Sequence, residues 1–177
     1  MEYYLLRQSV RVTNAVRPGD LDQWVYTARM THDDFRKLDT LRNAYIEYDR
    51  SRELPDLLIY PTYLVSDDIR KVFAMYDDSI SFKGVQLFPA DEKWIREASR
   101  IYWVYDCVTV DCLHADTAVQ PNGAIKELVL DRRKLDGRDI FKVRGTAENK
   151  TIVSLAVAES ILRRNPYGVT FEKAVIR

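Results

Sequence analysis

Three residues with ligand or acid–base side chains stand at alternate positions beyond the middle of the chain. They are Cys112, His114 and Asp116, and in an extended segment their side chains would point to the same side. Such a set could hold a metal ion, or the imidazole could activate the thiol. A soft metal site usually takes four protein ligands, and the sequence shows no second cluster. The alternative is that Cys112 packs in the core while His114 and Asp116 follow the end of a strand.

Other catalytic patterns are absent or weak. The six glycines are too far apart for a dinucleotide or P-loop motif, and two histidines alone make no HExxH zinc motif. Asp106, Asp111 and Asp131 could meet as the carboxylates of a metal-dependent nuclease, although any α+β protein offers such sets. Cys107 and Cys112 have opposite parity in a strand, so no disulfide between them is expected. These absences argue against the commonest nucleotide-binding, hydrolase and zinc-protease functions, and we expect no metal and no cofactor.

Two local irregularities indicate a surface that binds a partner. Asp77 and Asp78 fall at the expected C-terminal end of a helix, where negative charge is unfavourable. Trp94 lies in a charged stretch beside Glu92, and an aromatic residue there either covers the edge of a core or anchors a partner. Asp77, Asp78, Glu92 and Trp94 are therefore the candidate partner-binding residues. The alternatives are that the helix ends earlier, or that the acidic residues pair with nearby lysines.

The composition is typical of a soluble globular domain. The chain of 177 residues has 27 basic and 27 acidic side chains and 46% hydrophobic residues. This balance argues against nucleic-acid binding, and the longest uncharged run, Leu57–Ser66, is too short to cross a membrane. The N-terminus lacks a signal-peptide pattern, and two cysteines make no disulfide framework. We expect one domain over residues 1–177 in the cytoplasm.

Charge is uneven along the chain. Residues 56–121 are rich in acidic side chains, and residues 122–177 are rich in basic ones. Such asymmetry can mark an interaction surface. It can also cancel in space, if the two halves interleave in one sheet.

Short β-rich runs alternate with a few helix signals. Thr31 and Asp34 match a capping box, and apolar residues then recur at helical spacing at Phe35, Leu38, Leu41 and Tyr45. Ser66 and Ser154 are placed to cap two further helices. Strands are expected at Tyr3–Leu6, Val10–Val12, Trp24–Ala28, Leu57–Tyr60, Val85–Phe88, Ile101–Leu113 with a bend near Asp106, Ile125–Leu130, Ile140–Val143, Thr151–Val153 and Val169–Ile176. The pattern predicts an α+β fold, a mostly antiparallel mixed sheet with two or three helices packed against it.

The chain from about residue 55 to the C-terminus resembles the eleventh immunity-protein family of bacterial polymorphic-toxin systems, formerly a domain of unknown function. Four blocks carry the resemblance: Leu64–Ser66 with the helix after it, Val85–Pro89, Val110–His114, and the run from Leu128 to Phe171. The order and spacing of the blocks are similar to those of the family, and none of the blocks is a catalytic signature. The sequence departs at His114, where the family often has Asp. Residues 1–54 match less clearly and form a variable N-terminal part before an immunity-like core at residues 55–177.

The resemblance implies a non-enzymatic inhibitor that binds a cognate toxin domain and blocks its active site or its substrate path. An acidic surface at Asp77, Asp78 and Glu92 would suit a basic toxin such as a nuclease. Two alternatives stay open. One is a small enzyme that uses Cys112, His114 and Asp116, and the other is a homo-oligomeric structural or regulatory partner, with a homodimer formed through edge strands.

Overall fold

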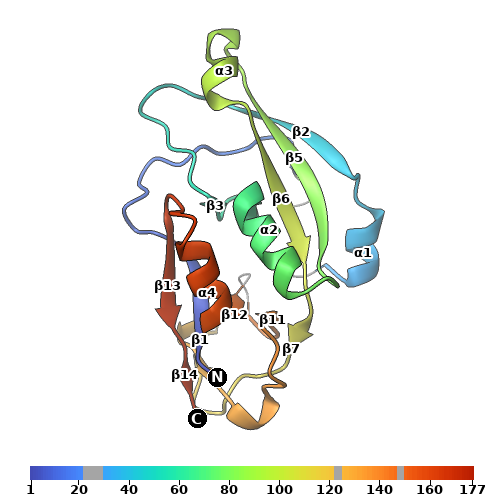
Figure 1. The fold of residues 1–177 in the computed structure, drawn as a ribbon, viewed down its shortest axis with the longest axis vertical. Coiled ribbons are helices and arrows are strands. Elements are labelled where there is room, and N and C mark those ends of the chain that lie inside the picture. Colours follow the sequence, from blue (N-terminus) through green and yellow to red (C-terminus); the bar gives the residue numbers. More distant parts are fainter. Residues whose placement is uncertain (22–29, 122–124, 147–149) are drawn as a thin grey trace.

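Two five-stranded sheets form the framework of the protein (Figure 1). The computed structural model describes residues 1–21, 30–121, 125–146 and 150–177. Sheet 1 contains, in spatial order, β2 (Leu41–Ile46), β5 (Ser81–Pro89), β6 (Arg100–Asp106), β4 (Leu64–Ser66) and β3 (Leu57–Leu58). Sheet 2 contains β13 (Val169–Lys173), β1 (Tyr3–Gln8), β12 (Thr151–Ser154), β11 (Ile140–Val143) and β7 (Thr109–Val110).

Each five-stranded sheet is antiparallel except at one edge. β2 runs parallel to β5, and β7 runs parallel to β11. The short strands β8 (Ala118–Val119) and β9 (Ile125–Glu127) pair with each other, as do β10 (Val129–Leu130) and β14 (Val175–Ile176). The helices are α1 (His32–Lys37), α2 (Asp67–Tyr76), α3 (Ile95–Ala98) and α4 (Leu155–Leu162), with short 3-10 turns η2 (Glu92–Trp94) and η3 (Arg132–Lys134). The fold is therefore α+β with mostly antiparallel sheets, which confirms the predicted class.

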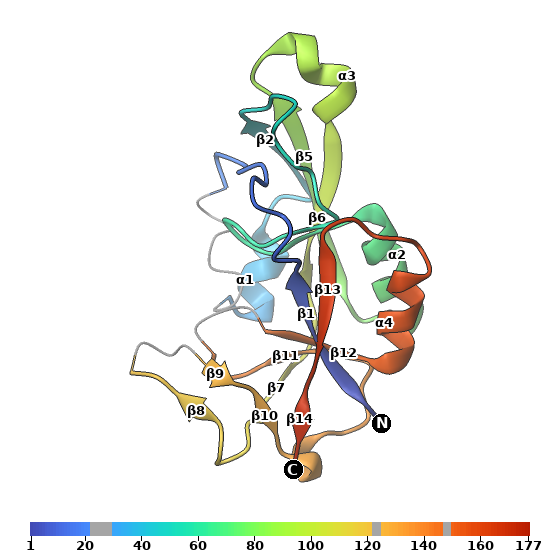
Figure 2. The same cartoon turned by 90° about the vertical axis from the view of Figure 1, so that its left-hand side faces the viewer.

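One hydrophobic core joins the two sheets under α2 and α4. These helices pack together on the same side of both sheets (Figure 2). Leu6 and Val153 of sheet 2 meet Val65 and Tyr105 of sheet 1 in this core, and Phe73 of α2 lies edge-on to the Tyr105 ring at 5.1 Å. The ends of the chain and its middle therefore contribute to the same core.

The opposite face of each sheet has a core of its own. Behind sheet 1, a second cluster includes Val16, Leu21, Phe35, Leu54, Val85 and Tyr102. Behind sheet 2, a third cluster includes Tyr3, Cys112, Leu130, Phe141 and Ile152. β1 lies between β12 and β13, and β2 pairs with β5, so the N-terminal part of the chain contributes a strand to each five-stranded sheet. None of the described helices is both long and apolar enough to cross a membrane.

Local sequence signals located several elements correctly. Thr31 and Asp34 form the predicted capping box, and Ser154 accepts a hydrogen bond from the backbone N–H of Val157. The predicted bend near Asp106 is confirmed, because the chain leaves sheet 1 at Asp106 and enters sheet 2 at Thr109. Ser66 occupies the N-cap position of α2, but its hydroxyl makes no capping bond.

The helix predicted from Thr31 through Tyr45 is wrong beyond Lys37. Leu41–Ile46 forms the edge strand β2, because pairing with β5 buries Ala44 and Ile46 on the inner face. Leu41 and Tyr45, whose spacing suggested a helix, stay exposed on the outer face. Val10–Val12 is also not a strand, since the N–H of Val12 bonds to the carbonyl of Ser9 in a turn. The strand expected at Trp24–Ala28 lies outside the described residues.

Candidate partner-binding site

The four predicted partner-binding residues lie at opposite ends of β5. Asp77 and Asp78 follow α2 just before the strand, whereas Glu92 and Trp94 lie in η2 just after it. The nine residues of β5 separate the pairs by about 30 Å at the rise of an extended strand. The four residues therefore do not form one cluster.

The carboxylates of Asp77 and Asp78 differ in their contacts within the chain. Asp77 ends α2, and its carboxylate accepts hydrogen bonds from the N–H and hydroxyl of Ser79 at 2.9 and 2.6 Å. This local turn explains an acidic residue at a helix C-terminus. Asp78 is exposed and has no ion pair with any described residue. Of the two, only Asp78 presents its charge fully to solvent.

Trp94 covers the edge of the core behind sheet 1. Its ring meets Tyr48 edge-on at 5.7 Å, and the cations of Arg50 and Lys93 lie over it at 5.6 and 5.4 Å. The side chain is half-buried among these neighbours. A tryptophan in a charged stretch is thus explained by cation–π contacts within the chain. Glu92 beside it is exposed.

The predicted Cys112, His114 and Asp116 set does not converge. Cys112 is fully buried in the core behind sheet 2, and burial raises the pKa of its thiol to about 11. His114 lies nearer the surface, where its Nδ1 accepts a hydrogen bond from the backbone N–H of Asp116. The Asp116 carboxylate pairs with Arg177 and also lies 3.5 Å from Nδ1 of His114. The thiol is therefore separated from its proposed base and held in the protonated, weakly nucleophilic form.

The three carboxylates predicted for a nuclease, those of Asp106, Asp111 and Asp131, each make contacts with different residues. Asp131 accepts bonds from the backbone and guanidinium of Arg133, which holds the pKa of that carboxyl below its ordinary value. Asp111 lies 4.0 Å from Lys134, and Asp106 lies at the end of β6. Within the described ranges, no three His, Cys, Asp or Glu residues are placed to hold a metal ion.

A charged group that the sequence did not reveal lies where sheet 1 meets sheet 2. Lys142 is buried in β11, with Nζ donating to the carbonyl of Tyr105 at 3.0 Å and lying 3.8 Å from Asp106. The other carboxylate oxygen of Asp106 contacts Nδ1 of His32, which is largely exposed. Cys107 lies nearby, but burial raises the pKa of its thiol to about 12 despite the Lys142 cation. We read this group as a structural link between α1 and the two sheets.

The outer face of sheet 1 leaves large side chains uncovered beyond α2. We call this surface the open apolar face; it consists of Leu41, Tyr45, Phe88, Ile101 and Trp103. Leu41 and Tyr45 are 55% and 56% exposed, and the other three are partly exposed. The strand register places all five on the same side of the sheet.

The members of the open apolar face are in contact across the strands. Tyr45 and Phe88 have ring centroids 6.4 Å apart. Leu41, Ile101 and Trp103 converge over Gly84, where an added Cβ would lie 2.8 Å from a Leu41 methyl group. The guanidinium of Arg70 in α2 lies 4.7 Å from the centre of the Trp103 ring, so the open apolar face ends there against α2. Figure 2 shows no helix over this part of the sheet between α2 and α3.

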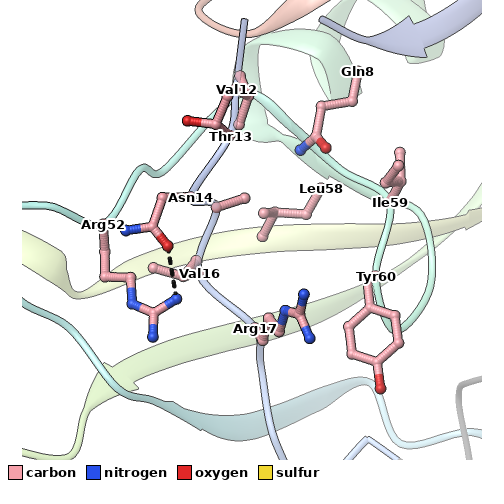
Figure 3. A pocket seen from close by; sticks show the side chains of 11 residues that line it. Gln8, Val12, Thr13, Asn14, Val16, Arg17, Arg52, Leu58, Ile59 and Tyr60 are labelled. Atoms are coloured by element: carbon pink, nitrogen blue, oxygen red, sulfur yellow. Dashed lines mark hydrogen bonds between the residues drawn. The ribbon is translucent and has the colours of Figure 1, made fainter. Parts of the chain in front are cut away.

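A hollow of about 380 Å³ lies where the segment after β1 meets the loop after β3 (Figure 3). Its walls come from the segment of residues 12–17 and from Leu58, Ile59 and Tyr60, and Arg17 and Arg52 line it as well. The guanidinium of Arg17 lies 5.4 Å from the centre of the Tyr60 ring. Arg52 donates to the side-chain carbonyl of Asn14 at 3.0 Å. No sequence motif pointed to this hollow, because its residues are separated in the chain.

A scan against protein-family models and a search of curated proteins both find no match for this chain. The resemblance to the eleventh immunity-protein family therefore stays a prediction.

Proposed function

We propose that this chain is a non-enzymatic immunity protein. It binds a cognate bacterial toxin domain in the cytoplasm of the producing cell and blocks the toxin's active site or its substrate path. The sequence resemblance suggests this function, and the open apolar face is the structural observation that supports it.

The open apolar face has the composition of a binding surface. Contiguous exposed apolar groups on a soluble protein often mark an interaction site, and aromatic side chains are enriched among the residues that contribute most to binding. The side chains of Leu41, Tyr45, Phe88 and Trp103 project from paired strands of one sheet. The backbone therefore sets their positions before a partner binds. Such preorganisation reduces the entropy lost on binding.

The alternative of a Cys–His enzyme receives no support from the arrangement of the residues it needs. Cys112 is buried in a core, and the two partners it would require lie outside that core. A binding function needs no such convergence, and it is compatible with carboxylates that are each engaged in local hydrogen bonds or ion pairs.

The test is co-expression with the toxin domain encoded beside this chain, with cell growth and a purified complex as the two readouts. We expect rescue of growth and a stable complex for the native chain. Leu41→Asp should weaken the complex by at least about tenfold, because it places a charge at the centre of an apolar contact. Leu162→Asp is the matched control, since Leu162 is 52% exposed on α4, outside the open apolar face.

Two results would count against different parts of the proposal, the function and the binding surface. A folded chain that neither rescues growth nor forms a complex would reject the immunity function. A complex that Leu41→Asp and Leu162→Asp weaken equally would keep the function and exclude the open apolar face. Sedimentation of the free chain decides whether this face instead joins two copies: a dimer that Leu41→Asp dissociates would favour the homo-oligomer.

A further inference from the structure

The hollow is lined by two guanidinium groups, those of Arg17 and Arg52. Neither has a carboxylate within 4.0 Å among the described residues, although the negative charge of Asp49 acts on Arg52 from farther away. Glu53, next to Arg52 in the chain, turns its carboxylate to the backbone N–H groups of Thr13 and Asn14 and to the hydroxyl of Tyr167. The two guanidinium groups therefore make no direct ion pair with the described part of the chain.

Neutral groups hold both guanidinium groups in place. Asn14 accepts a hydrogen bond from Arg52, and its own amide donates to the carbonyl and hydroxyl of Ser51. Arg17 is held over the Tyr60 ring. A guanidinium fixed by an amide oxygen or an aromatic ring keeps its full charge and several free N–H donors. Figure 3 shows both groups beside the hollow, with Val16 between them.

The side chains that line the hollow indicate the chemical character and the size of the ligand. Val12, Val16 and Leu58 are apolar, and Ile59 and Tyr60 are 45% and 60% exposed at the rim. The volume of about 380 Å³ is that of a site for a small organic molecule. A second hollow of about 460 Å³ adjoins the first, because Arg17 and Arg52 line both, and it also contains Glu47 and Tyr45. The carboxylate of Glu47 makes the second hollow less suited to an anion.

We propose that the hollow at Arg17, Arg52 and Tyr60 binds a small organic oxyanion, a phosphate or carboxylate attached to an apolar or planar group. The oxyanion pairs with the two guanidinium groups, which match the geometry of carboxylate and phosphate oxygens. The apolar part of the ligand packs against Leu58, Ile59 and the Tyr60 ring. This binding uses residues other than those of the open apolar face, although Tyr45 of that face lines the adjoining second hollow.

The experiment is a titration of the isolated chain, followed by amide chemical shifts and by calorimetry. The probes are phenyl phosphate and benzoate, with benzamide as the uncharged control. We expect saturable shifts at residues 12–17 and 58–60 with either anion and none with benzamide. Raised salt should weaken the binding, since the contact is ionic. The probe that binds more tightly, phenyl phosphate or benzoate, shows whether the site prefers a phosphate or a carboxylate ligand.

Substitutions assign the binding to the two arginines. Arg17→Gln and Arg52→Gln should each weaken the tighter probe by about tenfold, a loss of about 1.4 kcal/mol in binding free energy. Arg52→Lys keeps the charge and should weaken it less. Arg163→Gln is the control, because that arginine lies on α4 and pairs with Glu159. Circular dichroism establishes that each variant is folded.

Three outcomes would overturn this inference. They are no saturable binding of either anion, equal binding of benzamide, and affinity unchanged by both Arg17→Gln and Arg52→Gln. Leu41→Asp should leave anion binding unchanged, so failure of the anion site and failure of the immunity function can be distinguished.

Discussion

The two five-stranded sheets differ in how their faces are covered. In sheet 2, every residue of β11 and β12 is buried, because one face packs on α4 and the shared core and the other on the third cluster. In sheet 1, the interior strands β5 and β6 leave Phe88, Ile101 and Trp103 partly exposed, and the edge strand β2 leaves Leu41 and Tyr45 exposed. The interior strands of sheet 2 therefore mainly stabilise the fold, whereas sheet 1 also has an uncovered apolar surface.

A pair of phenylalanine substitutions tests this comparison with the largest expected effect. Phe141 of β11 is 1% exposed and meets Tyr3 edge-on at 5.5 Å, whereas Phe88 of β5 is partly exposed. Phe141→Ala should lower the free energy of unfolding by about 3–5 kcal/mol, and Phe88→Ala by less than about 1.5 kcal/mol. Urea denaturation measures both. Equal losses would show that the outer face of sheet 1 contributes to stability as much as the interior of sheet 2.

The buried cation of sheet 2 should have the next largest effect. Lys142→Met keeps the apolar stem but removes the donor to the Tyr105 carbonyl and the cation near Asp106. We expect a loss of about 2 kcal/mol in the free energy of unfolding, because two polar partners lose a charged neighbour. Lys173→Met, which removes an exposed cation paired with Glu2, should change stability much less. A stable Lys142→Met variant would show that the interior of sheet 2 does not require this charge.

The burial of the two cysteines should make the stability of the protein depend on pH. Cys107 lies in the core shared by the two sheets, and Cys112 lies in the core behind sheet 2. Burial raises the pKa of Cys107 to about 12 and that of Cys112 to about 11, from an ordinary value of 9.0. Below pH 9 both states keep the proton. Above it the unfolded chain releases protons that the folded chain retains, so stability should fall by up to about 1.4 kcal/mol per pH unit for each thiol.

A double Cys107→Ala, Cys112→Ala variant should show a shallower fall over the same pH range, whatever its stability at neutral pH. Thiol reagents should modify the native chain at pH 8 only as fast as it opens. Rapid modification of the folded chain would contradict the burial of these residues.

Charge reversal at Asp77 and Asp78 should have the smallest effect. If Asp77 and Asp78 border the toxin contact, their replacement by Lys should slow association a few-fold at low salt, with little effect at high salt. Asp78→Lys alone is the cleaner test, because Asp77 also bonds to Ser79. Asp33→Lys on α1 serves as the control. An on-rate that stays the same at low salt would remove Asp77 and Asp78 from the interface and limit it to the apolar residues.

Elements with signals inside a few residues were predictable. The capping box at Thr31, the cap at Ser154 and the burial of Cys112 in apolar surroundings follow from adjacent residues and their ordinary preferences. The spacing of Leu41 and Tyr45 wrongly indicated a helix, because residues four positions apart also lie on one face of a strand. The candidate site was less predictable, since the irregular positions of Asp77 and Trp94 are explained by contacts within the chain.

The α+β class, the positions of most strands and the weakness of any catalytic motif could be predicted from the residues alone, because these features depend on local pattern and composition. Which faces are uncovered and which charges are unpaired depends on the way the elements pack in three dimensions. The open apolar face lies beyond α2, whose Arg70 lies over the Trp103 ring. In the hollow, Arg17 lies next to Tyr60 and Arg52 next to Asn14. These contacts join residues about 40 positions apart, and their register is set by sheet pairing and core packing rather than by any local preference.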